Sequence, residues 1–167
     1  AERGRTVLFG GHASSGDFED TWEWDGSTWV ERTPPTSPRS RWGHALAYDS
    51  ARGFTVLFGG WAGANLADTW EWDGTSWVQR ALAPNALPRH FHAMVYDSAR
   101  SRVVLFGGFY GSALNDTWEF DGAAWLQRAS TGPTPSPRFQ MALAYDAARE
   151  KAVLFGGGPA AFSTPFG

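Results

Sequence analysis

The sequence has no cysteine, a single lysine (Lys151) and no apolar run long enough to form a membrane-spanning helix. The lack of cysteine excludes disulfides, thiolate nucleophiles and thiolate zinc sites. The formal net charge is only −3, and neither sign forms a long run, which argues against a nucleic-acid groove or a basic membrane-binding face. We therefore expect no nucleic-acid partner and no membrane insertion.

What the sequence does contain is a repeat. The motif Val-Leu-Phe-Gly-Gly occurs four times, and its first glycines are spaced by 49, 48 and 49 residues. An Asp-Thr-Trp-Glu motif and an Arg motif that ends in Tyr-Asp follow the same period. The Asp-Thr-Trp-Glu motif begins at Asp20, Asp68 and Asp116, and the Arg motif begins at Arg41, Arg89 and Arg138. Periods of this size are typical of propellers and solenoids.

Constant spacings inside the repeat predict hairpins, because a strand register fixes length whereas a surface loop tolerates insertion. The three segments that join Tyr-Asp to Gly-Gly have one length. The tryptophan of each Asp-Thr-Trp motif is always 7 residues before the lone tryptophan that follows the Asp-Gly turn. Thr-Trp-Glu-Trp alternates as a strand does, with both tryptophans on one face. We therefore predict four short antiparallel strands per repeat and thirteen in the chain.

These features resemble the kelch repeat: a second strand that ends in Gly-Gly, an aromatic third strand, a lone tryptophan beyond it, and an arginine that opens the first strand. The repeats are similar to Trp-rich bacterial kelch repeats and to the superfamily of the galactose oxidase central domain. The resemblance implies an all-β fold, a β-propeller of four-stranded antiparallel kelch blades with the first strand nearest the central channel. About 3.25 blades are present, so we interpret the chain as an arc of a larger propeller.

The repeat also divides the chain. Residues 1–32 form a partial blade that lacks its first strand, 41–80 and 89–128 are full blades, 138–157 is a partial blade of two strands, and 158–167 is a loop or tail, all in one propeller domain. We expect the repeated glycines and tryptophans to be structural, with the tryptophans packed between blades. They are Gly10, Gly11, Gly59, Gly60, Gly107, Gly108, Gly156, Gly157, Trp22, Trp29, Trp70, Trp77, Trp118 and Trp125.

The repeated arginines have two interpretations. The resemblance implies that Arg41, Arg89 and Arg138 lie near the channel mouth, where arginines of some kelch domains bind acidic peptides. A residue that recurs in every blade is more often architectural, so we favour a role in tying neighbouring blades together through loop carbonyls and an aspartate. For the repeated aspartates we expect caps on loop N–H groups, because no Asp-x-Asp-x-Asp calcium loop is present.

Residues that do not repeat are better candidates for specificity. Trp61, Phe109 and Tyr110 directly follow Gly-Gly, and His12 stands there in the first copy. Such an aromatic shelf can stack a sugar or grip a peptide, and the alternative is that the loop tips fold back on the blade. We expect no metal site and no cofactor, because Met141 replaces the repeated histidine in the third copy of the Arg motif.

We expect a non-catalytic module for protein interaction or scaffolding, extracellular or at the cell surface, whose partners are a protein, a peptide or further blades of the same propeller. No Gly-x-Ser-x-Gly or phosphate-loop motif appears, and the copper cofactor of galactose oxidase requires a cysteine that is absent. One alternative is a carbohydrate-binding module that uses the loop aromatics. The other is part of a propeller enzyme whose active site lies in further blades.

Overall fold

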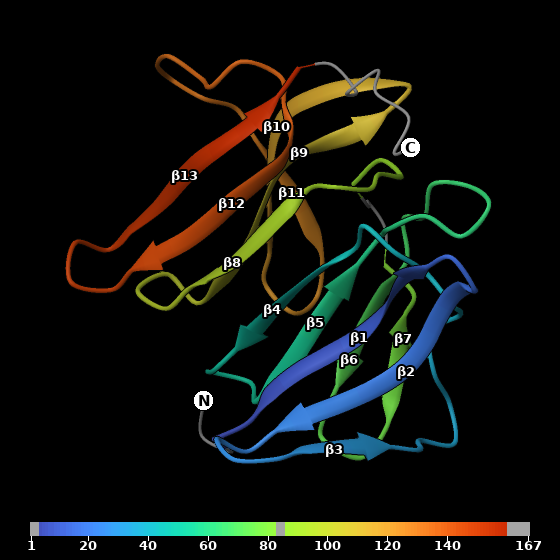
Figure 1. The fold of residues 1–167 in the computed structure, drawn as a ribbon. Coiled ribbons are helices and arrows are strands. Elements are labelled where there is room, and N and C mark those ends of the chain that lie inside the picture. The colour runs from blue at the N-terminus through green and yellow to red at the C-terminus, as the bar shows by residue number, and fades with distance from the viewer. Residues whose placement is uncertain (1–3, 83–85, 160–167) are drawn as a thin grey trace.

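The computed structural model describes residues 4–82 and 86–159, which contain thirteen strands in four antiparallel sheets and no helix (Figure 1). Sheet 1 comprises β1 (Thr6–Ala13), β2 (Gly16–Trp24) and β3 (Trp29–Arg32). Sheet 2 comprises β4 (Ala45–Asp49), β5 (Phe54–Phe58), β6 (Thr69–Trp72) and β7 (Trp77–Arg80). Sheet 3 comprises β8 (Ala93–Asp97), β9 (Arg102–Tyr110), β10 (Ser112–Phe120) and β11 (Trp125–Arg128). Sheet 4 comprises β12 (Phe139–Asp146) and β13 (Lys151–Gly158). The predicted all-β class and the antiparallel four-stranded unit are confirmed.

Within each sheet, strands that are neighbours in sequence are also neighbours in space. The register is the same in sheets 2 and 3, where the aspartate that ends the first strand pairs with the residue that opens the second, as Asp49 does with Phe54. The Asp-Gly positions are tight turns: Asp73 accepts hydrogen bonds from the N–H groups of Thr75 and Ser76, and Gly74 has a φ of 101°. The aspartate accepts hydrogen bonds from the backbone two and three residues further on, and the glycine after it adopts a positive φ. These two requirements explain why Asp-Gly recurs in each turn.

The sheets meet along their first strands. β8 contacts both β4 and β12, so the three first strands of sheets 2, 3 and 4 lie next to one another. In Figure 1, sheets 1 and 2 form the lower part of the molecule and sheets 3 and 4 the upper part. The main hydrophobic cluster joins sheets 2 and 3 and includes Phe58, Leu105 and Trp125.

One contact between sheets is repeated. The indole N–H of Trp77 in sheet 2 donates to the hydroxyl of Thr21 in sheet 1 at 3.0 Å, and Trp125 in sheet 3 donates to Thr69 in sheet 2 at 3.0 Å. Trp77 and Trp125 are 1% and 0% exposed. Trp29 holds the same repeat position in sheet 1 but is 43% exposed, and its ring contacts the ring of Trp24 in its own sheet. The described residues place no sheet before sheet 1, so the packing predicted for this position occurs at Trp77 and Trp125 and not at Trp29.

The repeated glycines are required where the next sheet approaches. A Cβ on Gly59 or Gly107 would lie 2.7 Å from the carbonyl oxygen of Arg89 or Arg138, and both glycines have a φ of 62°. A side chain is therefore excluded by the neighbouring backbone as well as by the left-handed conformation. Gly156, at the same position in sheet 4, has nothing within 4 Å of its Cβ position.

The turn between the first and second strands offers a test of backbone strain. Its left-handed position is Gly53 in sheet 2 and Glu150 in sheet 4, with φ values of 78° and 54°. We expect Glu150→Gly to raise the free energy of unfolding by roughly 0.5–1 kcal/mol, because glycine removes the steric cost of positive φ and loses part of that gain to chain entropy. Urea denaturation measures it. Lys151→Gly, one residue on and inside β13, is the control that should lower stability, and a lower stability for Glu150→Gly would contradict the interpretation.

Candidate functional site: an aromatic belt on an arginine framework

Arg41 joins two sheets. Its guanidinium group is completely buried and donates to both carboxylate oxygens of Asp68, at 2.6 and 2.8 Å, and to the carbonyl of Gly59 at 2.9 Å, all in sheet 2. Its backbone bonds sheet 1 instead: the Arg41 carbonyl accepts from Gly11 at 2.9 Å, and its N–H donates to Phe18 at 3.2 Å. The side chain of Arg41 therefore bonds sheet 2, and its backbone bonds sheet 1, the preceding sheet.

Arg89 repeats this arrangement with Asp116, at 2.6 and 2.8 Å, and is also completely buried. Arg138 donates to the carbonyl of Gly156 at 3.0 Å but has no carboxylate partner among the described residues. In two of the three arginines predicted as candidate ligand-binding residues, the guanidinium group is thus buried and bound to an aspartate of its own sheet. Burial raises the pKa of Asp68, but the hydrogen bonds and the charge of Arg41, together with the hydrogen bond from Trp70, outweigh burial and hold that pKa below its usual value.

The expectation that the repeated aspartates cap loop N–H groups needs correction. Asp68 accepts hydrogen bonds from Arg41 and, at 2.8 Å, from the indole N–H of Trp70. Trp22 and Trp118 donate to Asp20 and Asp116 in the same way, at 2.6 and 2.7 Å. Trp70 and Trp118 therefore support the arginine–aspartate pairs of sheets 2 and 3.

Sequence reasoning missed the buried glutamates of the Thr-Trp-Glu motif. Glu71 is buried in sheet 2 and forms ion pairs with Arg52 and Arg80. Glu23 accepts the indole N–H of Trp72, in the next sheet, at 3.0 Å. Strand alternation assigns this glutamate to the face opposite the tryptophans, but that face is also covered by a neighbouring sheet. The sequence signal for these ion pairs is an arginine nine residues after each glutamate.

Aromatic rings from all four sheets form one connected row, which we call the aromatic belt. It runs His12–Trp42–Trp61–His90–Phe109–Phe139, with successive ring centroids 5.9, 6.3, 5.6, 5.6 and 5.3 Å apart. Phe91 packs beside it against Trp42 and Phe139. The aromatic belt therefore contains three of the four predicted loop residues: His12, Trp61 and Phe109.

Short backbone pairs hold the belt in place. Trp42 and Trp61 exchange two hydrogen bonds, at 3.1 and 2.8 Å, and His90 and Phe109 exchange two at 3.2 and 2.9 Å. The residue after Gly-Gly is therefore paired with the residue after the arginine of the same sheet. Tyr110 is the exception: it follows Phe109 in β9, so alternation directs it to the other face, where it is 46% exposed.

The middle of the belt is uncharged. His90 lies between Trp61 and Phe109, and its Nδ1 is 2.6 Å from the side-chain oxygen of Asn65. Burial lowers the pKa of His90, so its ring is neutral at pH 7. At the sheet 1 end, His12 is exposed and its Nδ1 is 2.7 Å from Asp17. The belt thus offers an apolar, aromatic middle and one polar end.

Two other histidines lie beneath the belt and give the fold a pH dependence. Burial, and secondarily the charge of Arg41, lowers the pKa of His44 to about 4, and burial lowers that of His92 well below its usual value. The unfolded chain binds these protons near pH 6.5 and the folded chain does not, so stability falls as the pH drops from about 6.5 toward about 4.

We expect His44→Met/His92→Met to weaken this dependence, because methionine already fills the position as Met141, which is 8% exposed. Each histidine removed should reduce the slope of unfolding free energy against pH by up to about 1.4 kcal/mol per pH unit. Urea denaturation at several pH values between about 7 and about 5 measures it. An unchanged slope in the double variant would show that other groups cause the acid sensitivity.

No known protein family matches the chain, and a search of curated proteins finds no relative. Across residues 4–82 and 86–159, no three His, Cys, Asp or Glu side chains are grouped so as to hold a metal ion. Over the same ranges, no helix is long and apolar enough to cross a membrane.

Proposed function

We propose that the chain is an arc of a kelch-type β-propeller and that it serves as a protein-interaction or scaffolding module. The repeat period of 48 or 49 residues, the two sheets of four strands in chain order and the contacts among β4, β8 and β12 support this architecture. The same Arg–Asp pair in sheets 2 and 3, and the same Trp–Thr contact across two junctions, indicate that successive sheets dock by one rule.

The aromatic belt is the observation that carries the recognition role. Tryptophan and other aromatic side chains dominate the energetics of protein interfaces because they bury a large area at low conformational cost. Trp42, Trp61, His90 and Phe109 are each only partly buried, so the belt retains surface for a partner. Its middle is neutral, so its natural partner is a polypeptide segment that presents apolar or aromatic side chains.

Selection of peptides on the immobilised chain tests this function. We expect a phage-displayed library of random peptides to yield aromatic-rich binders whose affinity falls about tenfold or more in Trp61→Ala and Phe109→Ala, the loss typical of a central interface aromatic. Tyr110→Ala is the matched control, because it removes an exposed aromatic that lies off the belt. Each variant's urea midpoint is measured to separate lost binding from lost folding.

The outcome against the proposal is equally specific. No enrichment of peptides, or peptides whose binding depends on Tyr110 and not on Trp61, would refute the role of the belt. A glycan array run with the same variants tests the carbohydrate alternative, which requires Trp61, Phe109 and Tyr110 to act on one surface. Because Tyr110 lies on the opposite face of β9 from Phe109, we favour the polypeptide.

A further inference from the structure

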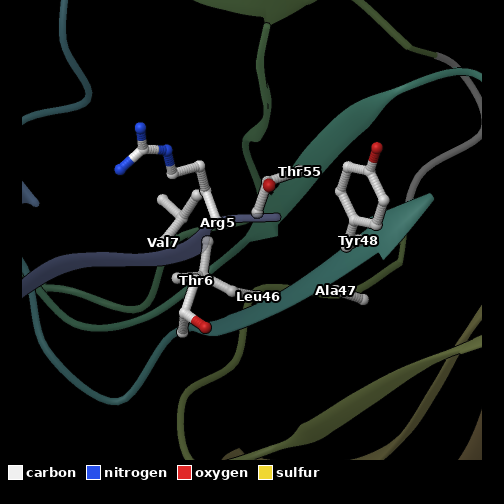
Figure 2. Close-up of a pocket in the computed structure, with 7 residues that line it drawn as sticks. All are labelled: Arg5, Thr6, Val7, Leu46, Ala47, Tyr48 and Thr55. Carbon is white, nitrogen blue, oxygen red and sulfur yellow. The ribbon is translucent and has the colours of Figure 1, made fainter. Parts of the chain in front are cut away.

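We propose that the cavity between β1 and β4 is a seat for an extended polypeptide strand that carries an arginine and adds to the free edge of β1. This surface is separate from the aromatic belt, and its biological use rests on the proposed role in polypeptide recognition. The cavity has a volume of about 230 Å³. Figure 2 shows Arg5, Thr6 and Val7 on one side of it and Leu46, Ala47 and Tyr48 of β4 on the other.

The free edge is the first observation. β1 pairs with β2 on one edge and with no strand of the described residues on the other. Its counterparts β5, β9 and β13 each pair on that edge with the first strand of their sheet, β4, β8 and β12. An unpaired edge presents N–H and C=O groups that another strand can satisfy.

The cavity lies where that strand belongs. β12 contacts β8, and β8 contacts β4, so each first strand lies beside the first strand of the next sheet. A strand paired with β1 and placed beside β4 continues this series. The register of sheet 2, in which Ala45 pairs with Phe58 and Asp49 with Phe54, would set five residues of the added strand opposite Arg5 to Phe9.

Asp20 indicates that the added strand carries an arginine. In sheets 2 and 3 the equivalent carboxylates, Asp68 and Asp116, each bind the arginine at the start of the first strand with both oxygens. Among residues 4–82 and 86–159, Asp20 accepts only the indole N–H of Trp22 through Oδ2, and its Oδ1 is buried with no hydrogen-bond partner. A buried carboxylate oxygen without a donor is costly, and a guanidinium group is the donor that this position receives elsewhere.

Tyr48 supplies an independent observation on the other side of the cavity. Its hydroxyl is buried and has no hydrogen-bond partner in the part of the chain that the structure describes. Tyr145, at the same position in sheet 4, accepts a hydrogen bond at 3.3 Å from the N–H of Ala99, in the turn that follows β8 of the preceding sheet. The occupant of the seat is therefore a strand that begins with arginine, runs antiparallel to β1 and ends in a turn that reaches Tyr48.

A synthetic peptide with the sequence of residues 39–53 is the probe, because it is this chain's own example of such a strand together with the turn that follows it. We expect saturable binding, a higher thermal midpoint of the chain, and slower amide hydrogen exchange at residues 5–9. The Arg41→Gln form of the peptide, and the Asp20→Asn form of the chain, should each bind about tenfold or more weakly, the loss expected when a charge-assisted hydrogen-bond pair is removed.

Several results would overturn the proposal. Equal binding of the Arg41→Gln peptide, or no binding up to about millimolar peptide, where affinity is negligible, would exclude an arginine-dependent seat. Protection at residues 54–58 instead of 5–9 would mean that the peptide displaces β4. A dimer of the chain alone that Asp20→Asn abolishes would assign the seat to a second copy. Tyr110→Ala and Trp61→Ala leave the seat intact, so failure of this test and failure of belt recognition are distinguishable.

Discussion

Replacing Trp125 with alanine should lower the free energy of unfolding by about 3–5 kcal/mol, the range for removing a buried large aromatic side chain. Trp125 is completely buried, stacks on Phe120 at a centroid distance of 5.1 Å and packs on Phe58 of sheet 2. Its loss also removes the hydrogen bond to Thr69. Urea denaturation followed by far-ultraviolet circular dichroism measures the change.

Trp29→Ala is the matched control for this prediction. It deletes the same repeat position, but Trp29 is 43% exposed and has no sheet to cover it among the described residues. We expect it to cost less than about 1 kcal/mol, as most surface substitutions do. Equal losses for the two variants would mean that the tryptophans stabilise their own hairpins and not the junction between sheets.

The second large effect is expected at the arginine–aspartate pair of sheet 3. Asp116→Asn leaves Arg89 completely buried without its counter-charge, which should lower stability by about 3–5 kcal/mol. The double variant Arg89→Met/Asp116→Asn should recover much of the loss, because it removes the uncompensated charge. Thermal and urea unfolding of the single and double variants measure both effects.

Asp20→Asn is the control here, since Asp20 has no arginine partner among the described residues and the amide oxygen of asparagine can still accept from Trp22. We expect a change of less than about 1 kcal/mol. If Asp116→Asn is as mild as Asp20→Asn, the buried pair does not stabilise the framework. If the double variant is no better than the single one, the loss comes from lost packing and not from an unpaired charge.

The repeat in the sequence predicted the strands well, because constant spacing between Gly-Gly, tryptophan and Tyr-Asp reflects a fixed register. It could not predict which copies are buried. Trp29 and Trp125 hold the same position in the repeat, and the presence or absence of a neighbouring sheet among the described residues makes one buried and the other exposed. Burial at a junction depends on contacts that local periodicity does not contain.

The belt was predicted only in part for a related reason. The position directly after Gly-Gly predicts His12, Trp61 and Phe109 as site residues, whereas Trp42 and His90 lie within the Arg motif, which predicts the first strand. The bridges that bring Trp42 to Trp61 and His90 to Phe109 join segments 19 residues apart. The available signal was an aromatic or histidine ring directly after the arginine in all three copies.

The same tryptophan–threonine contact docks sheet 2 on sheet 1 and sheet 3 on sheet 2, and two double-mutant cycles test this docking most directly. Trp125→Phe with Thr69→Val, and Trp77→Phe with Thr21→Val, each remove a 3.0 Å hydrogen bond between sheets while keeping the rings in place. We predict coupling energies of about 0.5–1.5 kcal/mol that agree between the two junctions. Coupling near zero at both, or at only one, would contradict a common docking rule and the propeller architecture built on it.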